Sequence, residues 1–233
     1  MIKNNEILFL VRSYNEWEHL ISTIEHIKKW WFNKILVVDD WSNDWTYEKL
    51  NNRNDIFYIR HLLNRWWWAA LETGFEFIRK FENKLKIKYI VTFDADWQHD
   101  IADIKNFINA MSKYNVDIIL WSRFMENSYE NMPILRKLIL KWSKLFTFIM
   151  SNIKISDPHN GYRMIKIDVI KKIHLTMDWF EYASELIDII ANNFKLVEVP
   201  VNIKYTEYSL SKWQKNLNAL NIVLKMIRNK FLK

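Results

Sequence analysis

Two pairs of carboxylates each follow a run of apolar residues. Asp39 and Asp40 end the segment NKILVVDD, and Asp94 and Asp96 end the segment KYIVTFDAD. Alternate side chains of an extended segment point the same way, so Asp94 and Asp96 face one side. Their oxygens can hold Mg²⁺ or Mn²⁺ and leave coordination sites for water and a leaving diphosphate, whose charge the metal ion would offset. The alternative is that these carboxylates cap helices and keep loops soluble.

Strands and helices must bring both carboxylate pairs to one edge of a sheet. The spacing of apolar residues predicts that the two kinds of element alternate along the first half of the chain. The expected strands span residues 6–13, 33–40, 55–61, 88–96 and 116–123. The expected helices span residues 16–29, 69–81 and 100–113, with a further short helix capped by Asn43 or Asp44. This alternation predicts an α/β fold with a mostly parallel sheet, helices on both faces and ligands at the carboxyl ends of the strands.

The second half of the chain is less regular. We expect helices over residues 132–152 and 180–193, a loop leading into a strand over 156–166, and an extended segment over 195–205. Residues 213–233 form an amphipathic basic pattern, typical of a helix that either packs on the domain or lies on a membrane. The expected division is therefore a domain over 1–212 and a C-terminal helix over 213–233.

The composition is that of a folded protein without cysteine. With 233 residues, of which 50% are apolar and 26% charged, the chain can build one large domain, and no disulfide or thiolate metal site can form. No apolar run reaches about 18 residues, so we expect no membrane-spanning helix. The net charge of +7 suits an anionic substrate, an anionic membrane or a solvated surface, and no nucleic-acid recognition motif accompanies it. We expect a cytoplasmic protein, peripheral on the inner face of the cell membrane, and leave a homodimer open.

Eight short motifs follow one another along nearly the whole chain. They are SYNE (13–16), VVDDWSNDWT (37–46), LNRWWWAALETGFE (63–76), FDADWQHD (93–100), WSRF (121–124), DPHNGYRM (157–164), FEYASEL (180–186) and YSLSKWQK (208–215). Together they resemble the family 2 glycosyltransferases, in particular the branch that makes dolichol- or polyprenyl-phosphate sugars. The resemblance implies a GT-A-like fold and inverting transfer of a sugar from a UDP- or GDP-sugar to a polyprenyl or dolichyl phosphate. It also implies Mg²⁺ or Mn²⁺ as the cofactor.

The resemblance assigns roles to single residues. Those expected to bind the nucleotide-sugar are Tyr14, Glu16, Asp39, Asp40, Asn64, Arg65 and Asp94. The expected metal ligands are Asp94, Asp96 and Gln98. Those expected to bind the acceptor are Ser122, Arg123, Arg136, Asp157, Gly161 and Arg163. Asp96, Arg123 and Arg136 would be catalytic, and the planar guanidinium of the two arginines suits a phosphate.

Two other functions stay open. If the acceptor is a hydroxyl of a cell-envelope polysaccharide or glycolipid, a carboxylate must take its proton, and Glu181 or Glu185 is the candidate. If the many tryptophans of the chain are real, it is instead an inactive protein that binds a nucleotide-sugar or a membrane.

The chain has 13 tryptophans and two glycines, although glycine averages about 7% of residues in proteins. The family motifs carry glycine at Trp41, Trp45, Trp66, Trp67, Trp97, Trp121 and Trp213. Turns such as the one after Asp40 need a positive φ or a bare backbone, which glycine provides. Our hypothesis is that the gene uses UGA for glycine and was translated with UGA as tryptophan, which TGG codons at these positions would contradict. The alternatives are a tryptophan-rich chain with an aromatic sugar platform and a deliberate glycine-to-tryptophan design.

Overall fold

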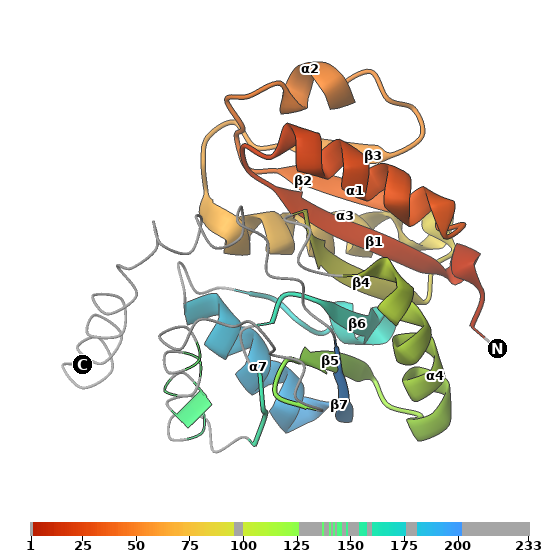
Figure 1. Cartoon of the computed structure of the whole chain (residues 1–233), viewed down its shortest axis with the longest axis vertical. Coiled ribbons are helices and arrows are strands. Elements are labelled where there is room, and N and C mark those ends of the chain that lie inside the picture. The colour runs from red at the N-terminus through yellow and green to blue at the C-terminus, as the bar shows by residue number, and fades with distance from the viewer. Residues whose placement is uncertain are drawn as a thin grey trace.

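The fold is built around a seven-stranded sheet. The computed structural model describes residues 2–95, 100–125, 154–157, 160–175 and 181–201, and singly residues 137, 140, 142, 144, 145 and 148. The strands are β1 (Ile7–Ser13), β2 (Ile35–Asp39), β3 (Phe57–Arg60), β4 (Tyr89–Asp94), β5 (Ile118–Ser122), β6 (Arg163–Lys166) and β7 (Leu196–Pro200). Their order is β3-β2-β1-β4-β6-β5-β7 (Figure 1). Only β6 runs antiparallel to its neighbours among these strands, so the predicted mostly parallel sheet is confirmed.

Helices cover both faces of the sheet, as the alternation predicted. On one face, α1 (Trp17–Lys29) and α4 (Ile104–Tyr114) contribute to the buried core that contains Phe9 and Val11 of β1. On the other face, α3 (Trp66–Leu85), α6 (Ile167–Ile170) and α7 (Glu181–Asn193) contribute to the buried core that contains Leu8 and Leu10 of β1. Figure 1 shows α1 in front of the sheet and α3 behind it. Because β1 is buried on both faces, its sequence is a nearly continuous apolar run rather than an alternating one.

The remaining elements of the described sequence are short: the 3-10 turns η1 (Asn4–Glu6) and η2 (Ile101–Asp103) and the helix α2 (Thr46–Leu50).

Most of the predicted bounds of helices and strands agree with the structure to within a few residues. Helix α3 begins at Trp66, three residues before the predicted start, so the three successive tryptophans belong to its first turn. The expected helix over 132–152 lies mostly outside the described residues, and the segment 213–233 lies wholly outside them. No helix in the described ranges is long and apolar enough to cross a membrane.

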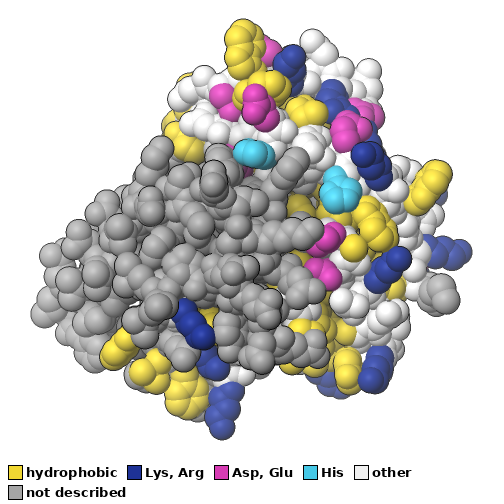
Figure 2. All heavy atoms as spheres, in the orientation of Figure 1, with side chains coloured by type: hydrophobic (Ala, Val, Ile, Leu, Met, Phe, Trp, Pro, Cys, Tyr) yellow, Lys and Arg dark blue, Asp and Glu magenta, His cyan; other side chains and the backbone are white. Residues whose placement is uncertain are grey.

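The excess positive charge is spread over the visible surface. Figure 2 shows basic side chains distributed around the described part of this face, next to hydrophobic ones along its lower and right-hand edges. Several large hydrophobic side chains are exposed, among them Trp31, Trp45, Leu62 and Leu63. On the described part of this face the basic side chains are therefore spread over several elements rather than gathered over one.

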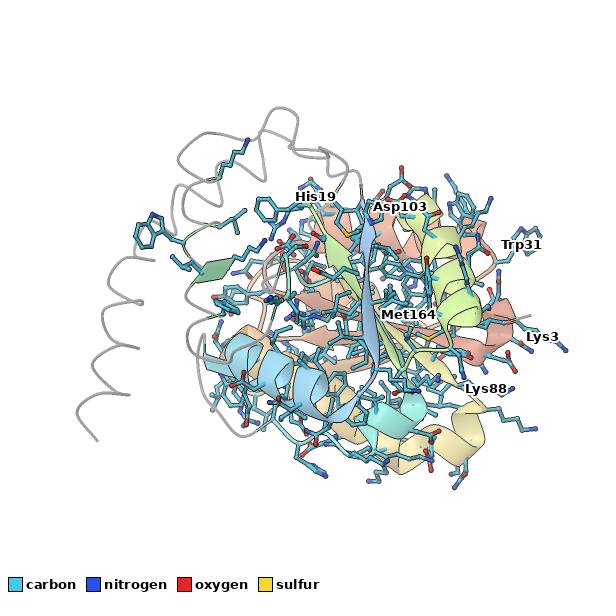
Figure 3. The ribbon with its side chains drawn as sticks, turned by 90° about the horizontal axis from the view of Figure 1, so that it is seen from below. Lys3, His19, Trp31, Lys88, Asp103 and Met164 are labelled. Carbon is cyan, nitrogen blue, oxygen red and sulfur yellow. The ribbon has the colours of Figure 1, made fainter. Side chains whose placement is uncertain are left out.

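Two tryptophans adopt a backbone conformation that suits glycine. Trp31 has φ 64° and Trp41 has φ 68°, which confirms that the turn after Asp40 needs a positive φ. Trp31 follows the last turn of α1, where a left-handed glycine commonly ends a helix, and its side chain points away from the body of the protein (Figure 3). Trp121 differs, because it is fully buried against Tyr162 and donates its indole N–H to the carbonyl of Pro200.

Replacing Trp31 by glycine should stabilise the protein. A left-handed L-residue costs about 1–2 kcal/mol, and the extra freedom of glycine in the unfolded chain returns about 0.5–1 kcal/mol of this. Trp31 is 79% exposed, so little packing is lost. We expect Trp31→Gly to raise the free energy of unfolding in urea by roughly 1 kcal/mol. Trp31→Ala keeps a Cβ atom and should bring no such gain, so equal stability of the two variants would contradict the prediction.

Candidate active site

The six parallel strands end at one edge of the sheet, and polar residues gather there. In the register of the sheet, Ser13 at the end of β1 lies opposite Asp39 at the end of β2, and Arg12 lies opposite Asp94 of β4. The backbone N–H of Asp40 donates to the carbonyl of Ser13 at 3.0 Å. The two carboxylate pairs therefore start from the ends of β2 and β4, the two strands that flank β1, as predicted for a ligand site at this edge.

Asp94 is held between an arginine and a glycine. Arg12, only 7% exposed, donates to Asp94 Oδ1 in an ion pair. A Cβ atom at Gly161 would lie 2.3 Å from Asp94 Oδ2, so a residue without a side chain is required there. The hydroxyl of Thr92 donates to the carbonyl of Gly161 at 2.5 Å and fixes this close approach. Arg12 was not among the predicted site residues, although it is a charged residue inside the apolar run of β1.

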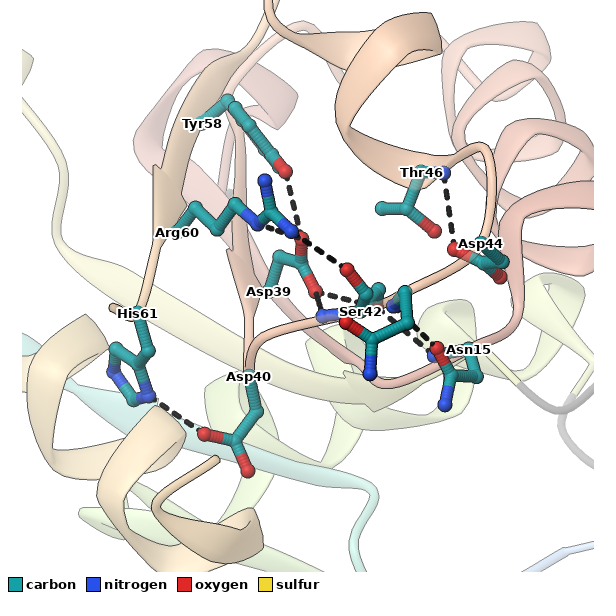
Figure 4. A network of polar contacts seen from close by, with 10 residues as sticks. Asn15, Asp39, Asp40, Ser42, Asp44, Thr46, Tyr58, Arg60 and His61 are labelled. Carbon is teal, nitrogen blue, oxygen red and sulfur yellow. Dashed lines mark hydrogen bonds and ion pairs between the residues drawn. The ribbon is translucent and has the colours of Figure 1, made fainter. Parts of the chain in front are cut away.

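Asp39 is fully buried and directs its hydrogen bonds into the protein (Figure 4). Its Oδ1 accepts from the backbone N–H of Ser42 at 2.9 Å and from the hydroxyl of Ser42 at 2.5 Å. Its Oδ2 accepts from the hydroxyl of Tyr58 at 2.7 Å, and Arg60 Nε lies 3.6 Å away. Burial, then the contact with Asp39, raises the pKa of Tyr58 far above its usual value, so the phenol stays a donor. Asp39 therefore locks the turn after β2.

Side chains also tie the loop after β1 to the loop after β2. The backbone N–H of Asn15 donates to Ser42 Oγ at 2.9 Å, and its side-chain oxygen accepts from the N–H of Asn43 at 2.7 Å. Asp44 accepts from the N–H of Trp17 at the start of α1 and from the N–H of Thr46 at the start of α2. Asp44 thus accepts from the first residue of each helix. The N-cap residue of α2 is Trp45, so the predicted N-cap at Asn43 or Asp44 is wrong by one or two residues. The loop after β1 also contains Tyr14, half-buried, and Glu16, buried.

Asp40 connects β2 to the start of α3. Its Oδ1 lies 2.7 Å from His61 Nδ1 and accepts from the backbone N–H of Arg65 at 2.8 Å. A carboxylate oxygen only accepts, so His61 donates from Nδ1, and its Nε2 lies 3.0 Å from the hydroxyl of Thr73. Arg65 is exposed and Asn64 half-buried, so both side chains remain partly open to solvent near this edge. The sequence analysis missed His61, which carries no pattern of its own.

Two of the residues expected to bind the acceptor, Arg123 and Asp157, form an ion pair. Arg123 donates to Asp157 through Nε and Nη2, each at 2.6 Å, and through its backbone N–H at 3.1 Å. Arg123 is 6% and Asp157 3% exposed, so the pair is buried. Ser122 Oγ contacts Ser156 Oγ, and Arg163 at the start of β6 is also buried. This two-bond pairing fixes the plane of the guanidinium.

Three expected residues lie outside the described part of the chain: Asp96, Gln98 and Arg136. Of the expected metal ligands, only Asp94 is placed. Within the described ranges, no three His, Asp or Glu side chains lie close enough together to hold a metal ion. The carboxylate of Asp94 has the hard oxygens that a divalent cation prefers, and its Oδ1 accepts from Arg12.

A model described as glycosyl transferase family 2 matches residues 9–174. The chain belongs to glycosyl transferase family 2. An uncharacterized protein of Methanocaldococcus jannaschii is 32% identical over 98% of this chain and 94% of its own length. The UDP-N-acetylglucosamine–dolichyl-phosphate N-acetylglucosaminyltransferase of Methanococcus voltae is 26% identical over 88% of each chain.

The fold of this family 2 glycosyltransferase is similar to that of solved structures of other proteins. Glucosyl-3-phosphoglycerate synthase of Mycobacterium tuberculosis, solved with Mn²⁺, UDP and phosphoglyceric acid, aligns with a TM-score of 0.58 at 10% identity. The alignment covers 89% of this chain and 73% of that one. The predicted GT-A-like fold and the resemblance to family 2 are confirmed, and so is the expectation of a glycosyltransferase. The family match ends at residue 174, so α7 and β7 lie beyond it.

Proposed function

We propose that this glycosyltransferase moves a sugar from a UDP- or GDP-sugar to a polyprenyl or dolichyl phosphate. The observation that carries the proposal is the gathering of Asp39, Asp40 and Asp94 at the carboxyl edge of a family 2 sheet. The relative from Methanococcus voltae, named for a dolichyl-phosphate acceptor, supports the choice of acceptor.

The loops after β1 and β2 are proposed to hold the nucleotide. They belong to one hydrogen-bonded unit through Asn15, Ser42 and Asp44, so a nucleoside would meet a preformed surface rather than two mobile loops. The residues assigned to the nucleotide-sugar are Tyr14, Glu16, Asp39, Asp40, Asn64, Arg65 and Asp94. Asp39 is fully buried and accepts from Ser42 and Tyr58, so it would act on the nucleotide through the shape of this surface.

Asp94, with Asp96 and Gln98, is proposed to hold Mg²⁺ or Mn²⁺. The bound ion would supply positive charge for the leaving diphosphate. Arg12 holds one oxygen of Asp94, and Gly161 leaves the room that the other oxygen needs. These two residues therefore orient the carboxylate toward its proposed task.

The acceptor phosphate is proposed to bind at the side of the edge formed by β5 and β6. The residues assigned to it are Ser122, Arg123, Arg136, Asp157, Gly161 and Arg163, with Asp157 holding Arg123 in place. A phosphate oxygen would attack the anomeric carbon as the bond to the diphosphate oxygen breaks, and the nucleoside diphosphate would leave with the electron pair. The phosphate is already an anion, so no general base is needed, and attack opposite the leaving group inverts the centre. A lipid acceptor would also give a purpose to the basic segment 213–233, which we propose to lie on the inner face of the membrane.

Transfer to a lipid phosphate can be measured by extraction. We expect the full chain with Mn²⁺ to move label from UDP-glucose, UDP-N-acetylglucosamine or GDP-mannose into the organic phase when undecaprenyl or dolichyl phosphate is present. The matched control is the same lipid alcohol without its phosphate, which should accept no label. EDTA should abolish transfer. Label that enters an added glycan hydroxyl, or is released only as free sugar, would contradict the proposal.

A further inference from the structure

Glu198 of β7 binds the loop that carries Asp157. In the sheet, β7 runs parallel to β5, and Glu198 lies opposite Leu120. The Glu198 carboxylate accepts from the backbone N–H of Ser156 at 2.9 and 3.0 Å and from the hydroxyl of Ser156 at 2.7 Å. It also accepts from the backbone N–H of Asp157 at 3.2 Å. One side chain of an outer strand therefore engages three donors of two adjacent loop residues.

The contacts continue from this loop to the arginine proposed to bind the acceptor phosphate. Asp157, fixed through its N–H, accepts from Nε, Nη2 and the backbone N–H of Arg123. Ser156, fixed through its N–H and hydroxyl, contacts Ser122 Oγ, which in turn accepts from the N–H of Phe124 at 3.1 Å. The end of β5 is thus held by two parallel paths that both start at Glu198.

In the described part of the chain, the carboxylates at the end of β2 make a different set of contacts. Asp39 and Asp40 accept from Ser42, Tyr58, His61 and Arg65. A disturbance at Glu198 should therefore reach the acceptor side and leave the nucleotide surface intact.

We propose that Glu198 is a positioning residue for the acceptor phosphate, an inference that rests on the proposed function. It sets the place of Arg123 through the residues 156–157 without touching the substrate. Removing its carboxylate leaves three donors without their acceptor, so the loop moves and Arg123 moves with it. A shift of about 1 Å in a binding group lowers a rate by up to about 100-fold.

Asp117 offers a matched control at the opposite end of the same strands. Its carboxylate accepts from the backbone N–H of Lys195 at 3.1 Å and from Lys166 Nζ at 3.1 Å, so it ties β7 and β6 to β5 at the other edge. A carboxylate that merely stabilises the sheet should behave alike at both places. Glu198→Ala, Glu198→Gln and Asp117→Ala are therefore compared at a temperature where circular dichroism shows all of them folded.

The experiment measures kcat and KM for both substrates, together with binding of farnesyl phosphate and of the nucleoside diphosphate. We expect Glu198→Ala to lower kcat/KM for the lipid phosphate by about 10- to 100-fold and to weaken farnesyl phosphate binding, with nucleotide binding unchanged. Glu198→Gln retains one accepting oxygen and should recover part of the loss, and Asp117→Ala should keep wild-type values.

Two failures can be told apart. Suppose that the wild type makes the lipid product. If Glu198→Ala then has the same kcat/KM for the lipid phosphate as the wild type, or loses nucleotide binding as much as farnesyl phosphate binding, the role of Glu198 is wrong and the proposed function stands. If the wild type binds nucleotide but neither transfers sugar to a prenyl phosphate nor binds farnesyl phosphate, the proposed function is wrong, and the acceptor role of Glu198 with it.

Discussion

Asp94→Asn should lower the rate of sugar transfer by at least about 100-fold, since even outer-shell partners of metal ligands are worth about 10- to 100-fold. Asparagine keeps an oxygen that can accept from Arg12, so the buried arginine is not left unpaired. The variant loses the negative charge that would hold the divalent ion. The measurements are initial rates of transfer and the rise in melting temperature caused by Mn²⁺ with UDP or GDP.

Asp117→Asn is the control for this variant, because Asp117 is likewise paired with a basic side chain, Lys166, but lies at the opposite edge of the sheet. It should keep the rate and the Mn²⁺-dependent shift in melting temperature. A wild-type rate in Asp94→Asn would refute the assignment of Asp94 to the metal ion.

Gly161→Ala should lower activity while most of the stability remains. The new Cβ atom would lie 2.3 Å from Asp94 Oδ2 and 3.1 Å from Arg12 Nη2, so the ion pair must shift away from the edge. Because the atoms that must move are those of the proposed metal ligand, we expect a loss of about 10- to 100-fold in kcat. Transfer rates and urea denaturation, taken on the same preparation, check this.

Gly74→Ala should have the opposite effect to Gly161→Ala, with a loss of stability rather than of activity. A Cβ atom at Gly74 would lie 2.4 and 2.6 Å from the two methyl carbons of Leu10, in the core between α3 and β1. Overpacking costs about 1–3 kcal/mol and exceeds the roughly 1 kcal/mol that alanine contributes to a helix. We expect lower stability with a nearly unchanged kcat for Gly74→Ala.

A Gly161→Ala variant that loses stability but not activity would contradict the prediction for Gly161, because it would mean that Gly161 serves packing alone.

Much of the fold was predictable because burial imposes a pattern on the sequence. The strands β1, β2, β4 and β5 are buried along nearly their whole length, and their apolar runs are visible in the sequence as such. The position of β6 between β4 and β5 was not predictable, since pairing across the sheet leaves no local signal. The start of α3 was placed three residues late, because three successive tryptophans obscure the spacing of apolar residues.

The carboxylates of the candidate site were predictable, whereas most of their partners were not. Asp39, Asp40 and Asp94 stand out because strands that end in acids are unusual. Tyr58, His61 and Glu198 meet these loops only through the fold, and their sequence neighbours give no hint of it. The roles of the assigned residues, and the domain bounds 1–212 and 213–233, remain predictions.

The insertion of β6 between β4 and β5 has a consequence for the newly made chain. Strands β1 to β4 can pair with one another as soon as they leave the ribosome, because their partners precede them or follow closely. β5 has no such partner in the described sheet, since it pairs with β6 and β7, both synthesised later. Until β6 and β7 are made, β5 is an unpaired apolar strand, although it is buried along its whole length in the finished sheet. During the same interval, the side of β4 that later pairs with β6 is also unpaired. Unpaired edges of this kind invite aggregation, so the interval between the synthesis of β5 and that of β6 is when this chain most needs a chaperone.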